Sequence, residues 1–555
     1  MDKRQSLISA TLLFTTITLG VWGVRLQSPL LLAICLVCAS LAVLKFNSLL
    51  SAVSLAVIGA LIQTGAQFTR LFGTDVHSAA VIAATISRSG WPATNVEIAW
   101  GFSGTPLLHI LAVLTSRITG TQIIPSDGSG ILATVLLPIV FVLTVAIIGG
   151  VMTSRINADV SSAHVVLLIA MWLPFLSWTG TFRRQSVGYV LFALVTFLIA
   201  IHKEKASKRV GLLLFIAFVS IAVAHHLTFV ILGMFLLCIV LANRVEKLPF
   251  ALQSMPDQSR LLIIFSTVGV LWFLFSTGGS TDIVLLVYGL FSLLAETTTA
   301  ASASGLGHGI YITFRDFLSR WIFQGLLSTG IIAAVVVEAR RSKLTGDQVA
   351  IAFFGVIIAA LSTTGIFFGG LDPDRLMTYL LLSGSAILAI QGWSSVESQH
   401  SIPAPKIAIV TLVVLGVLMI PPFLVSSQPP ALEQGVGSHQ ASPELYQTAY
   451  WINSYSNEPL VRGDIMIKEV ITPVGGVQIK SGVLEVKDGK IPRGMFVYRS
   501  ENRVQYSGWV YGDSTRVLTV DSSELSPDLS RSKVYTTGET KIYSGNSTPS
   551  LKASN

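Results

Sequence analysis

Residues 210–243 read VGLLLFIAFVSIAVAHHLTFVILGMFLLCIVLAN, and this stretch decides the fold. It contains two apolar runs of more than a dozen residues each, separated only by His225 and His226. A helix that crosses the roughly 30 Å of bilayer hydrocarbon needs about 20 mainly apolar residues. The stretch therefore predicts two consecutive membrane-spanning helices, residues 210–226 and 227–243, with the histidine pair at the end where they meet.

The composition of the whole chain agrees with this reading. Of 555 residues, 52% are apolar and only 12% are charged, whereas about 25% of residues are charged in a soluble globular protein. The mean hydropathy is +0.70. These values exclude a soluble enzyme, a disordered chain and a nucleic-acid-binding domain. We expect a multi-pass protein of the cell membrane, with membrane lipids and no nucleic acid among its partners.

The net charge and the cysteines do not change that conclusion. The formal charge is +8 and the pI is about 9.3, but Lys and Arg accumulate in the cytoplasmic loops of membrane proteins. Cys35, Cys38 and Cys238 all lie within apolar runs. The sequence therefore offers neither a disulfide framework nor a thiolate zinc site.

Hydropathy predicts about thirteen spans. They lie near residues 7–24, 29–45, 48–67, 129–152, 163–180, 185–202, 210–226, 227–243, 260–277, 321–338, 348–369, 376–392 and 407–426. The first follows Lys3 and Arg4 and lacks a small-residue cleavage site, so it reads as a retained helix and not as a signal peptide. The predicted fold class is an all-α polytopic membrane protein.

The basic residues give an orientation. From a cytoplasmic N-terminus, alternate loops contain Lys45, Arg155, Lys203, Lys205, Lys208, Arg209, Arg244, Lys247, Arg260, Arg340, Arg341 and Lys343. Counting residues 282–296 as a further span would place the last three of these outside the cell. We therefore interpret 282–296 as a re-entrant or interfacial helix in a long external loop, 278–320.

The composition changes after Pro421 and Pro422. Residues 1–426 form the predicted transmembrane domain, whereas 427–555 are polar and rich in Pro, Gly and Ser, with alternating segments such as 483–486. A hairpin is expected at Lys533–Tyr543, turning at Thr537 and Gly538. An odd number of spans places 427–555 outside the cytoplasm, as a domain of mixed α/β or mostly β structure.

The first external loop, 68–128, contains the sequence Gly73-Thr74-Asp75-Val76-His77. A carboxylate just beyond a span, with a histidine two residues later, can act as a general base, orient an acceptor hydroxyl or help to hold a divalent cation. Alternatively, Asp75 simply caps the helix that follows it. The two roles are compatible because the N-terminus of a helix also binds anions.

Two further groups lie at external span ends. Arg183 and Arg184 occupy a short external turn, against the positive-inside bias, and guanidinium groups there can bind a phosphate or reach lipid headgroups. His225 and His226 project in different directions if they lie on a helix, so they would be poor joint metal ligands. At least one of them can be a structural histidine.

The junction Gly370-Leu371-Asp372-Pro373-Asp374-Arg375 precedes a late span. Asp372 and Asp374 can neutralise Arg375 in a helix cap, or the three can place a guanidinium at the height of lipid phosphates. With the residues above, they form one set of charged and polar side chains on the predicted external face. This shared face is the strongest indication of a functional site.

Several segments resemble the GT-C superfamily of membrane glycosyltransferases, and the archaeal members in particular. They are GTDVHSAAVIAATISRSGWP, the short amphipathic helix TPLLHILAVLTSRITG, AHHLTFVIL, DPDRLMTYLLL and SPELYQTAYWINSY. The resemblance implies a polyprenyl (dolichyl) phosphate-linked sugar donor and an acceptor glycan, lipid or protein. It implies Asp75 as catalytic base, with His77 where many relatives have a second acid, so metal dependence stays open. Arg375, with Arg183 or Arg184, would hold the carrier phosphate.

Other functions compete with sugar transfer. A transporter or flippase for lipid-linked glycans would need charged residues along a path through the membrane, but the spans have few charges away from their ends. A polymerase or ligase of lipid-linked glycans uses the same donor chemistry and stays open. A scaffold that only displays 427–555 would leave the external charges unexplained. The sequence therefore favours a glycosyltransferase.

Overall fold

The structure is a computed structural model of the 555-residue chain. Before residue 106 it describes scattered residues from 11 to 87, among them the continuous stretch 28–46. It then describes residues 106–123, 136–172 except 158, 184–245 except 205–206, 259–275, 314–341, 345–368, 373–427 and 443–455. Nearer the C-terminus it describes 460–463, 478–480, 495–499, 505–510, 514–519, 532–536 and 540–544.

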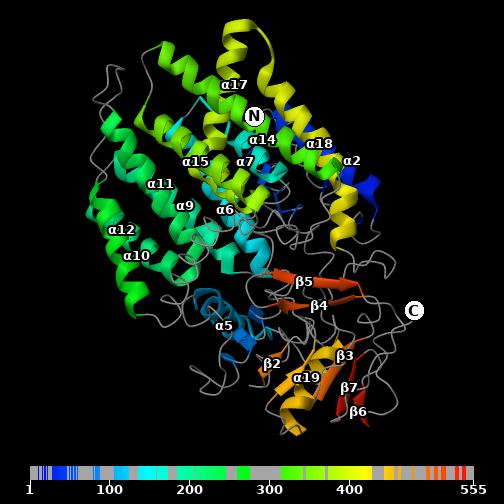
Figure 1. Ribbon diagram of the computed structural model, residues 1–555. Coiled ribbons are helices and arrows are strands. Elements are labelled where there is room, and N and C mark those ends of the chain that lie inside the picture. The colour runs from blue at the N-terminus through cyan, green and yellow to red at the C-terminus, as the bar shows by residue number, and fades with distance from the viewer. Residues whose placement is uncertain are drawn as a thin grey trace.

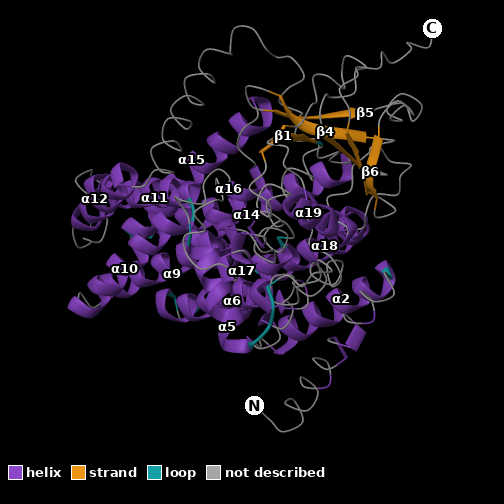
Figure 2. Ribbon diagram, turned by 90° about the horizontal axis from the view of Figure 1, so that it is seen from below, coloured by secondary structure: helices purple, strands orange, loops and turns teal. Residues whose placement is uncertain are grey.

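Helices make up most of the described chain (Figures 1 and 2). They are α2 (Pro29–Phe46), α5 (Leu107–Thr119), α6 (Leu137–Ile156), α7 (Ser162–Met171), α9 (Arg184–Glu204), α10 (Lys208–Ala224), α11 (His226–Val245), α12 (Ser259–Phe275), α14 (Phe314–Arg340), α15 (Gly346–Phe368), α16 (Pro373–Leu380), α17 (Ala386–His400), α18 (Ala404–Ser427) and α19 (Pro443–Tyr455).

Within the described residues, five helical stretches are long and apolar enough to cross a membrane. They are Leu137–Ile156, Arg184–His202, His226–Asn243, Trp321–Arg340 and Arg375–His400. Shorter apolar stretches are found in α2, α5, α7, α12, α15 and α18. The chain is therefore a mostly helical, multi-pass membrane protein. The predicted span 7–24 is described only at scattered residues, and the predicted helix 282–296 lies outside the described residues.

Two predicted spans differ from the structure in detail. In the span expected at 163–180, α7 ends at Met171 and Trp172 has a non-helical conformation, whereas residues 173–180 lie outside the described residues. The span expected at 376–392 is not one regular helix, because a π-helical turn, Leu381–Ser385, separates α16 from α17. Within that turn Gly384 has a φ of 101°, a conformation that strains residues with a side chain. The hydroxyls of Ser383 and Ser385 donate to the carbonyl of Leu380 and satisfy the disturbed backbone.

Small residues let two of the helices approach closely. A Cβ atom added at Gly330 of α14 would lie 2.8 Å from the Cα of Ala389 in α17. One added at Gly392 would collide with the carbonyl of Gly330 and lie 2.7 Å from the backbone nitrogen of Ala334. Close contact between backbones at small residues is a common way for helices to associate in membranes. The α14–α17 pair therefore forms a tight seam through the bundle.

The C-terminal residues add strands beside α19. A five-stranded sheet has the order β2-β1-β3-β7-β6, and β4 pairs only with β5. The strands are β1 (Leu460–Arg462), β2 (Gln478–Lys480), β3 (Met495–Arg499), β4 (Gln505–Val510), β5 (Ser514–Thr519), β6 (Ser532–Thr536) and β7 (Thr540–Ser544). β1 is parallel to β2 and β3, whereas β7 is antiparallel to β3 and β6. The predicted hairpin at Lys533–Tyr543 is confirmed as β6 and β7, but the segment 483–486 lies outside the described residues.

The α/β elements share a core with part of the helical region. Figure 1 shows α19 and the strands at one end of the helical bundle, on the same side as α5. One apolar cluster joins Leu445, Ala449 and Ile452 of α19 and buried residues of β1, β3 and β7 to Leu108 and Ala112 of α5. Val187 of α9 and Ala224 of α10 also belong to it. This cluster, called here the end cluster, marks the bundle end at which the candidate site lies.

Candidate functional site

The structure describes part of the residue set predicted from the sequence. Arg184, His225, His226 and Arg375 are described with their side chains, and Asp374 is described only as part of the backbone of α16. The remaining residues of the set, Asp75, His77, Arg183 and Asp372, lie outside the described residues. The geometry of the site therefore comes from α9, α11 and α16.

His225 occupies the break between two helices. It ends α10 in an extended conformation (φ −165°, ψ 119°), and its backbone N–H donates to the carbonyl of Ile221. Its carbonyl then accepts the first hydrogen bond of α11, from the backbone N–H of Phe229 (3.1 Å). Its Nδ1 accepts from the backbone N–H of Thr228 (3.3 Å), as the side chain of an N-cap residue does.

The two histidine rings lie together, contrary to the expectation that they project in different directions. The ring centroids of His225 and His226 are 5.0 Å apart and the planes are inclined by 23°. The prediction was wrong because it placed both residues on one helix, whereas only His226 is helical. The stacked pair presents two imidazole rings at the first turn of α11.

A chain of buried polar groups links His225 to α16. His225 Nδ1 and Thr228 Oγ1 are 3.0 Å apart, and Thr228 Oγ1 and the hydroxyl of Tyr379 are 2.6 Å apart. All three residues are at most 9% exposed. Buried polar groups of this kind hold their positions firmly, because breaking a hydrogen bond away from water is costly. The chain therefore fixes the start of α11 against α16.

A second chain links α9 to the residue that begins the late span. Gln185 Nε2 donates to the hydroxyl of Tyr189 (2.7 Å), and that hydroxyl makes a long hydrogen bond (3.4 Å) to the carbonyl of Arg375. The rings of Tyr189 and Tyr379 pack together with centroids 4.7 Å apart. Arg184 directly precedes Gln185, so the two arginine-bearing helix starts are held side by side.

Gly188 makes this approach possible. A Cβ atom added there would collide with Thr228 Oγ1 and lie 3.3 Å from the Cβ of His225. Any larger residue would push α9 away from the start of α11. The sequence therefore needs glycine at this position for the histidine pair to reach the arginines.

Positive charges converge on His225. Burial lowers the pKa of His225 well below its usual range, and the neighbouring His226, Arg184 and Arg375 lower this pKa further. An imidazole surrounded by burial and positive charge stays neutral at physiological pH. Arg184 and Arg375 are both half-buried and close enough to act on the same ring.

The helix geometry adds to this positive field. Arg184 is the first residue of α9, His226 is the first of α11, and Arg375 is the third of α16. Each helix N-terminus has backbone N–H groups without helical partners and the positive end of the helix dipole. Three such ends meet at the contacts described above, together with two guanidinium groups. The arrangement is suited to bind an anion such as a phosphate.

His109 of α5 extends the site toward the end cluster. It is 1% exposed, and burial lowers its pKa to about 3, with a further contribution from the charge of Arg184. Arg184 therefore lies within electrostatic reach of both His109 and His225. The predicted amphipathic helix in the second half of the first external loop is confirmed as α5, and it lies against α9 and α10.

Only some of the residues that could bind a metal ion are described by the structure. Within the described ranges, no group of three or more His, Cys, Asp or Glu side chains could hold a metal ion. Asp75 and His77, which the sequence offers as cation ligands, lie outside those ranges. A divalent cation at the first loop stays a prediction.

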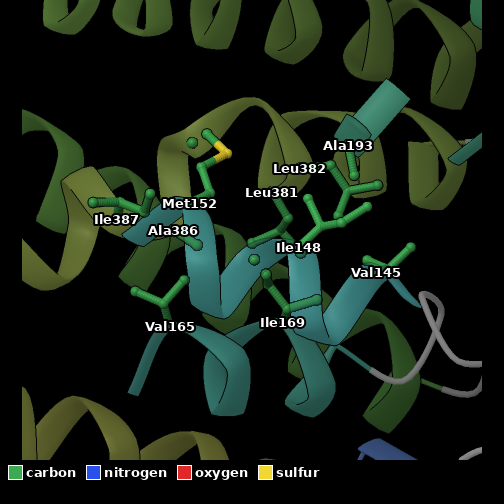
Figure 3. A pocket seen from close by; sticks show the side chains of 12 residues that line it. Val145, Ile148, Met152, Val165, Ile169, Ala193, Leu381, Leu382, Ala386 and Ile387 are labelled. Atoms are coloured by element: carbon green, nitrogen blue, oxygen red, sulfur yellow. The ribbon is translucent and has the colours of Figure 1, made fainter. Parts of the chain in front are cut away.

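A small cavity lies elsewhere in the bundle and has different chemistry. Figure 3 shows apolar side chains from α6, α7 and the π-helical turn pointing into it, among them Met152, Ile169 and Leu381. The full lining is Val145, Ile148, Gly149, Met152, Val165, Ile169, Ala193, Leu381, Leu382, Gly384, Ala386 and Ile387. None of these residues is charged or titratable, so the cavity is no candidate for the chemical site.

Sequence reasoning missed five residues of the site: His109, Gln185, Tyr189, Thr228 and Tyr379. Tyr189 and Tyr379 follow Gln185 and Arg375 by four positions and so share a helix face with them, but a tyrosine at this spacing inside a span does not by itself mark a site. Thr228 carries a weaker signal, as the third residue after His225. No local signal points to His109.

The fold has counterparts among solved structures. No family model and no curated protein matches the sequence. The oligosaccharyltransferase of Archaeoglobus fulgidus, solved in complex with Zn and sulfate, matches with a TM-score of 0.50 and 13% identity over 77% of this chain. The match covers 62% of that protein, less than two thirds of its length.

A second counterpart is ArnT from Cupriavidus metallidurans. Its apo structure matches with a TM-score of 0.49 and 12% identity, over 89% of this chain and 97% of that one. Its structure bound to undecaprenyl phosphate matches with a TM-score of 0.48 and 13% identity, over the same shares. At these identities the comparisons concern the fold. Over 77% of its length, the chain is similar in fold to the oligosaccharyltransferase of Archaeoglobus fulgidus.

Proposed function

We propose that this chain is a membrane glycosyltransferase that moves a sugar from a polyprenyl (dolichyl) phosphate-linked donor to an acceptor glycan, lipid or protein. One observation carries the proposal: the first turns of α9, α11 and α16 meet with Arg184, Arg375 and the histidine pair. This group of residues, called here the anion site, suits a phosphate at the end of a membrane helix bundle. The GT-C-like fold supports the same class of reaction.

The chemistry of transfer explains why such a site is useful. When the sugar leaves the carrier, negative charge develops on the departing phosphate. Guanidinium groups and helix N-termini fixed in place before the reaction stabilise that charge without reorganising. The chains through Tyr189 and Tyr379 hold the backbone at Arg375 and the start of α11 in position.

The acceptor needs a base for its hydroxyl proton. We assign this role to Asp75, with His77 as its neighbour, because they lie in the first sizeable loop after a span. Either residue could also hold a divalent cation beside the phosphate. On the predicted topology, Asp75 and the anion site share the extracytoplasmic face, which is the arrangement that sugar transfer requires of a base and a leaving-group site.

The test is sugar transfer by purified, reconstituted chain from a short polyprenyl phosphate-linked sugar. Arg375→Ala should lower transfer on the order of 10²-fold, as loss of a charge-stabilising donor does. Arg375→Lys should recover only part of it, because lysine lacks the bidentate fork. Arg155→Lys at the C-terminal end of α6 is the matched control and should leave transfer unchanged.

Unchanged transfer by Arg375→Ala would remove Arg375 from the phosphate site and move the role to Arg183 and Arg184. Movement of the lipid across the membrane without sugar transfer would instead favour the transporter alternative. Polymerisation of the acceptor would favour the polymerase or ligase alternative.

A further inference from the structure

We infer that His225 is a ligand of the phosphate bound at the anion site, through a neutral imidazole that donates its Nε2–H. The inference rests on the proposed function and deepens it, because it gives one histidine of the pair a defined protonation state and a defined atom. Three observations lead to it: the hydrogen bonds at Nδ1, the surroundings of the ring, and the access left at Nε2.

The first observation fixes the tautomer. The backbone N–H of Thr228 can only donate, and it donates to His225 Nδ1. A ring nitrogen that accepts a hydrogen bond has no proton, so in a neutral ring the proton is on Nε2. The hydroxyl of Thr228 then also donates to Nδ1, and its oxygen accepts from the hydroxyl of Tyr379.

The second observation keeps the ring neutral and in place. His225 is 9% exposed and stacks on His226, and the positive charges of Arg184 and Arg375 oppose a further proton on the ring. Gly188 leaves no space between α9 and the Thr228 side chain. The imidazole is therefore oriented from its Nδ1 side and has a single donor to offer.

The third observation concerns that donor. Among the described residues, His225 Nε2 has no hydrogen-bond partner. The Nε2 atom is not among the fully buried side-chain atoms that lack a partner, so an anion held by Arg184 and Arg375 can reach its N–H. An uncharged donor adds a directional contact to the phosphate without adding a third full charge to the site.

The experiment measures equilibrium binding of farnesyl phosphate, with inorganic phosphate as competitor, to the full chain in detergent. His225→Asn keeps an acceptor near the Nδ1 position but has no donor at Nε2, so its affinity should fall roughly 10- to 100-fold. His225→Gln can place an amide N–H near Nε2 and should bind within about threefold of the wild type. His202→Asn, near the other end of α9, is the matched control and should bind as the wild type does.

Other outcomes separate the inference from the proposed function. Loss of binding in Arg375→Ala with full binding in His225→Asn would overturn only the role of His225. Inorganic phosphate that competes as strongly as farnesyl phosphate would keep His225 as a ligand and overturn the lipid donor. Absence of binding of both anions to the wild type would overturn both proposals.

A measurement on the unaltered chain covers the case in which His225→Asn does not fold. Nitrogen-15 NMR of histidine-labelled protein should show His225 protonated at Nε2 and unprotonated at Nδ1, and the Nε2 signal should shift on addition of farnesyl phosphate. A proton on Nδ1, or a signal that farnesyl phosphate leaves unchanged, would overturn the inference.

Discussion

Tyr189 and Tyr379 pack ring against ring, and their hydroxyls lead to opposite parts of the anion site. The Tyr379 hydroxyl reaches Thr228 across 151 positions of sequence, and the Tyr189 hydroxyl reaches the Arg375 carbonyl across 186. Arg184, His225, His226 and Arg375 were predictable, because polar residues at the ends of apolar spans are conspicuous. The tyrosines and Thr228 were not predictable, because inside a span their polarity has meaning only once the partner helix is known.

At the same scale, the role of Asp75 as general base stays a prediction, and a substitution can distinguish it from a role as helix cap. Asp75→Asn keeps the size and much of the capping ability of the residue, so a simple cap should lose at most about 1 kcal/mol of stability and keep full transfer. Loss of a general base should instead lower the rate on the order of 10²- to 10⁴-fold with little change in thermal stability. Transfer rate and melting temperature of the two chains, measured side by side, distinguish these cases.

Near-normal turnover by Asp75→Asn would leave Asp75 as a cap. The choice of base would then pass to His77, to Glu296 of the predicted loop 278–320, or to Asp316 in the first turn of α14.

At the scale of helices, hydropathy predicts where spans lie but not how they are interrupted. The hydropathy of the run 376–392 does not indicate the π-helical turn, because a π turn changes the hydrogen-bond pattern without changing hydrophobicity. Gly384 is the local signal, since its positive φ is one that other residues adopt only with strain. Hydropathy also does not predict the close approach of α14 and α17, although the glycines that permit it can be seen in the sequence.

The α14–α17 seam makes a quantitative prediction. Gly392→Ala should destabilise the chain by about 1–3 kcal/mol, because the added methyl group collides with the carbonyl of Gly330 and forces the two helices apart. Gly211→Ala in α10 is the matched control, since nothing lies within 4 Å of its added Cβ. There the better helix propensity of alanine should leave stability unchanged or raise it by up to about 1 kcal/mol.

Thermal unfolding of both variants in the same detergent is the measurement. Equal melting temperatures for Gly392→Ala and Gly211→Ala would contradict the tight seam.

At the scale of the whole molecule, the basic loops predict a cytoplasmic N-terminus and an extracytoplasmic segment 427–555. In a chain without its three native cysteines, Lys205→Cys and Ser547→Cys should react with a membrane-impermeant maleimide from opposite sides of the membrane. The reason is that basic loops are retained in the cytoplasm. Labelling of both positions from the same side would show that the predicted topology is wrong.

The end cluster has a consequence for how the chain is made. The buried faces of α5 and of residues 79–86 are completed by Leu445, Ala449 and Ile452, which the ribosome adds more than 300 positions later. During synthesis these apolar faces, which adjoin the anion site, are left without their final cover while the membrane helices are already inserted. Assembly of this end of the protein is therefore a late, post-insertion event. A chain that stops at α18 would possess the arginines but lack the residues that cover the apolar surface beside them.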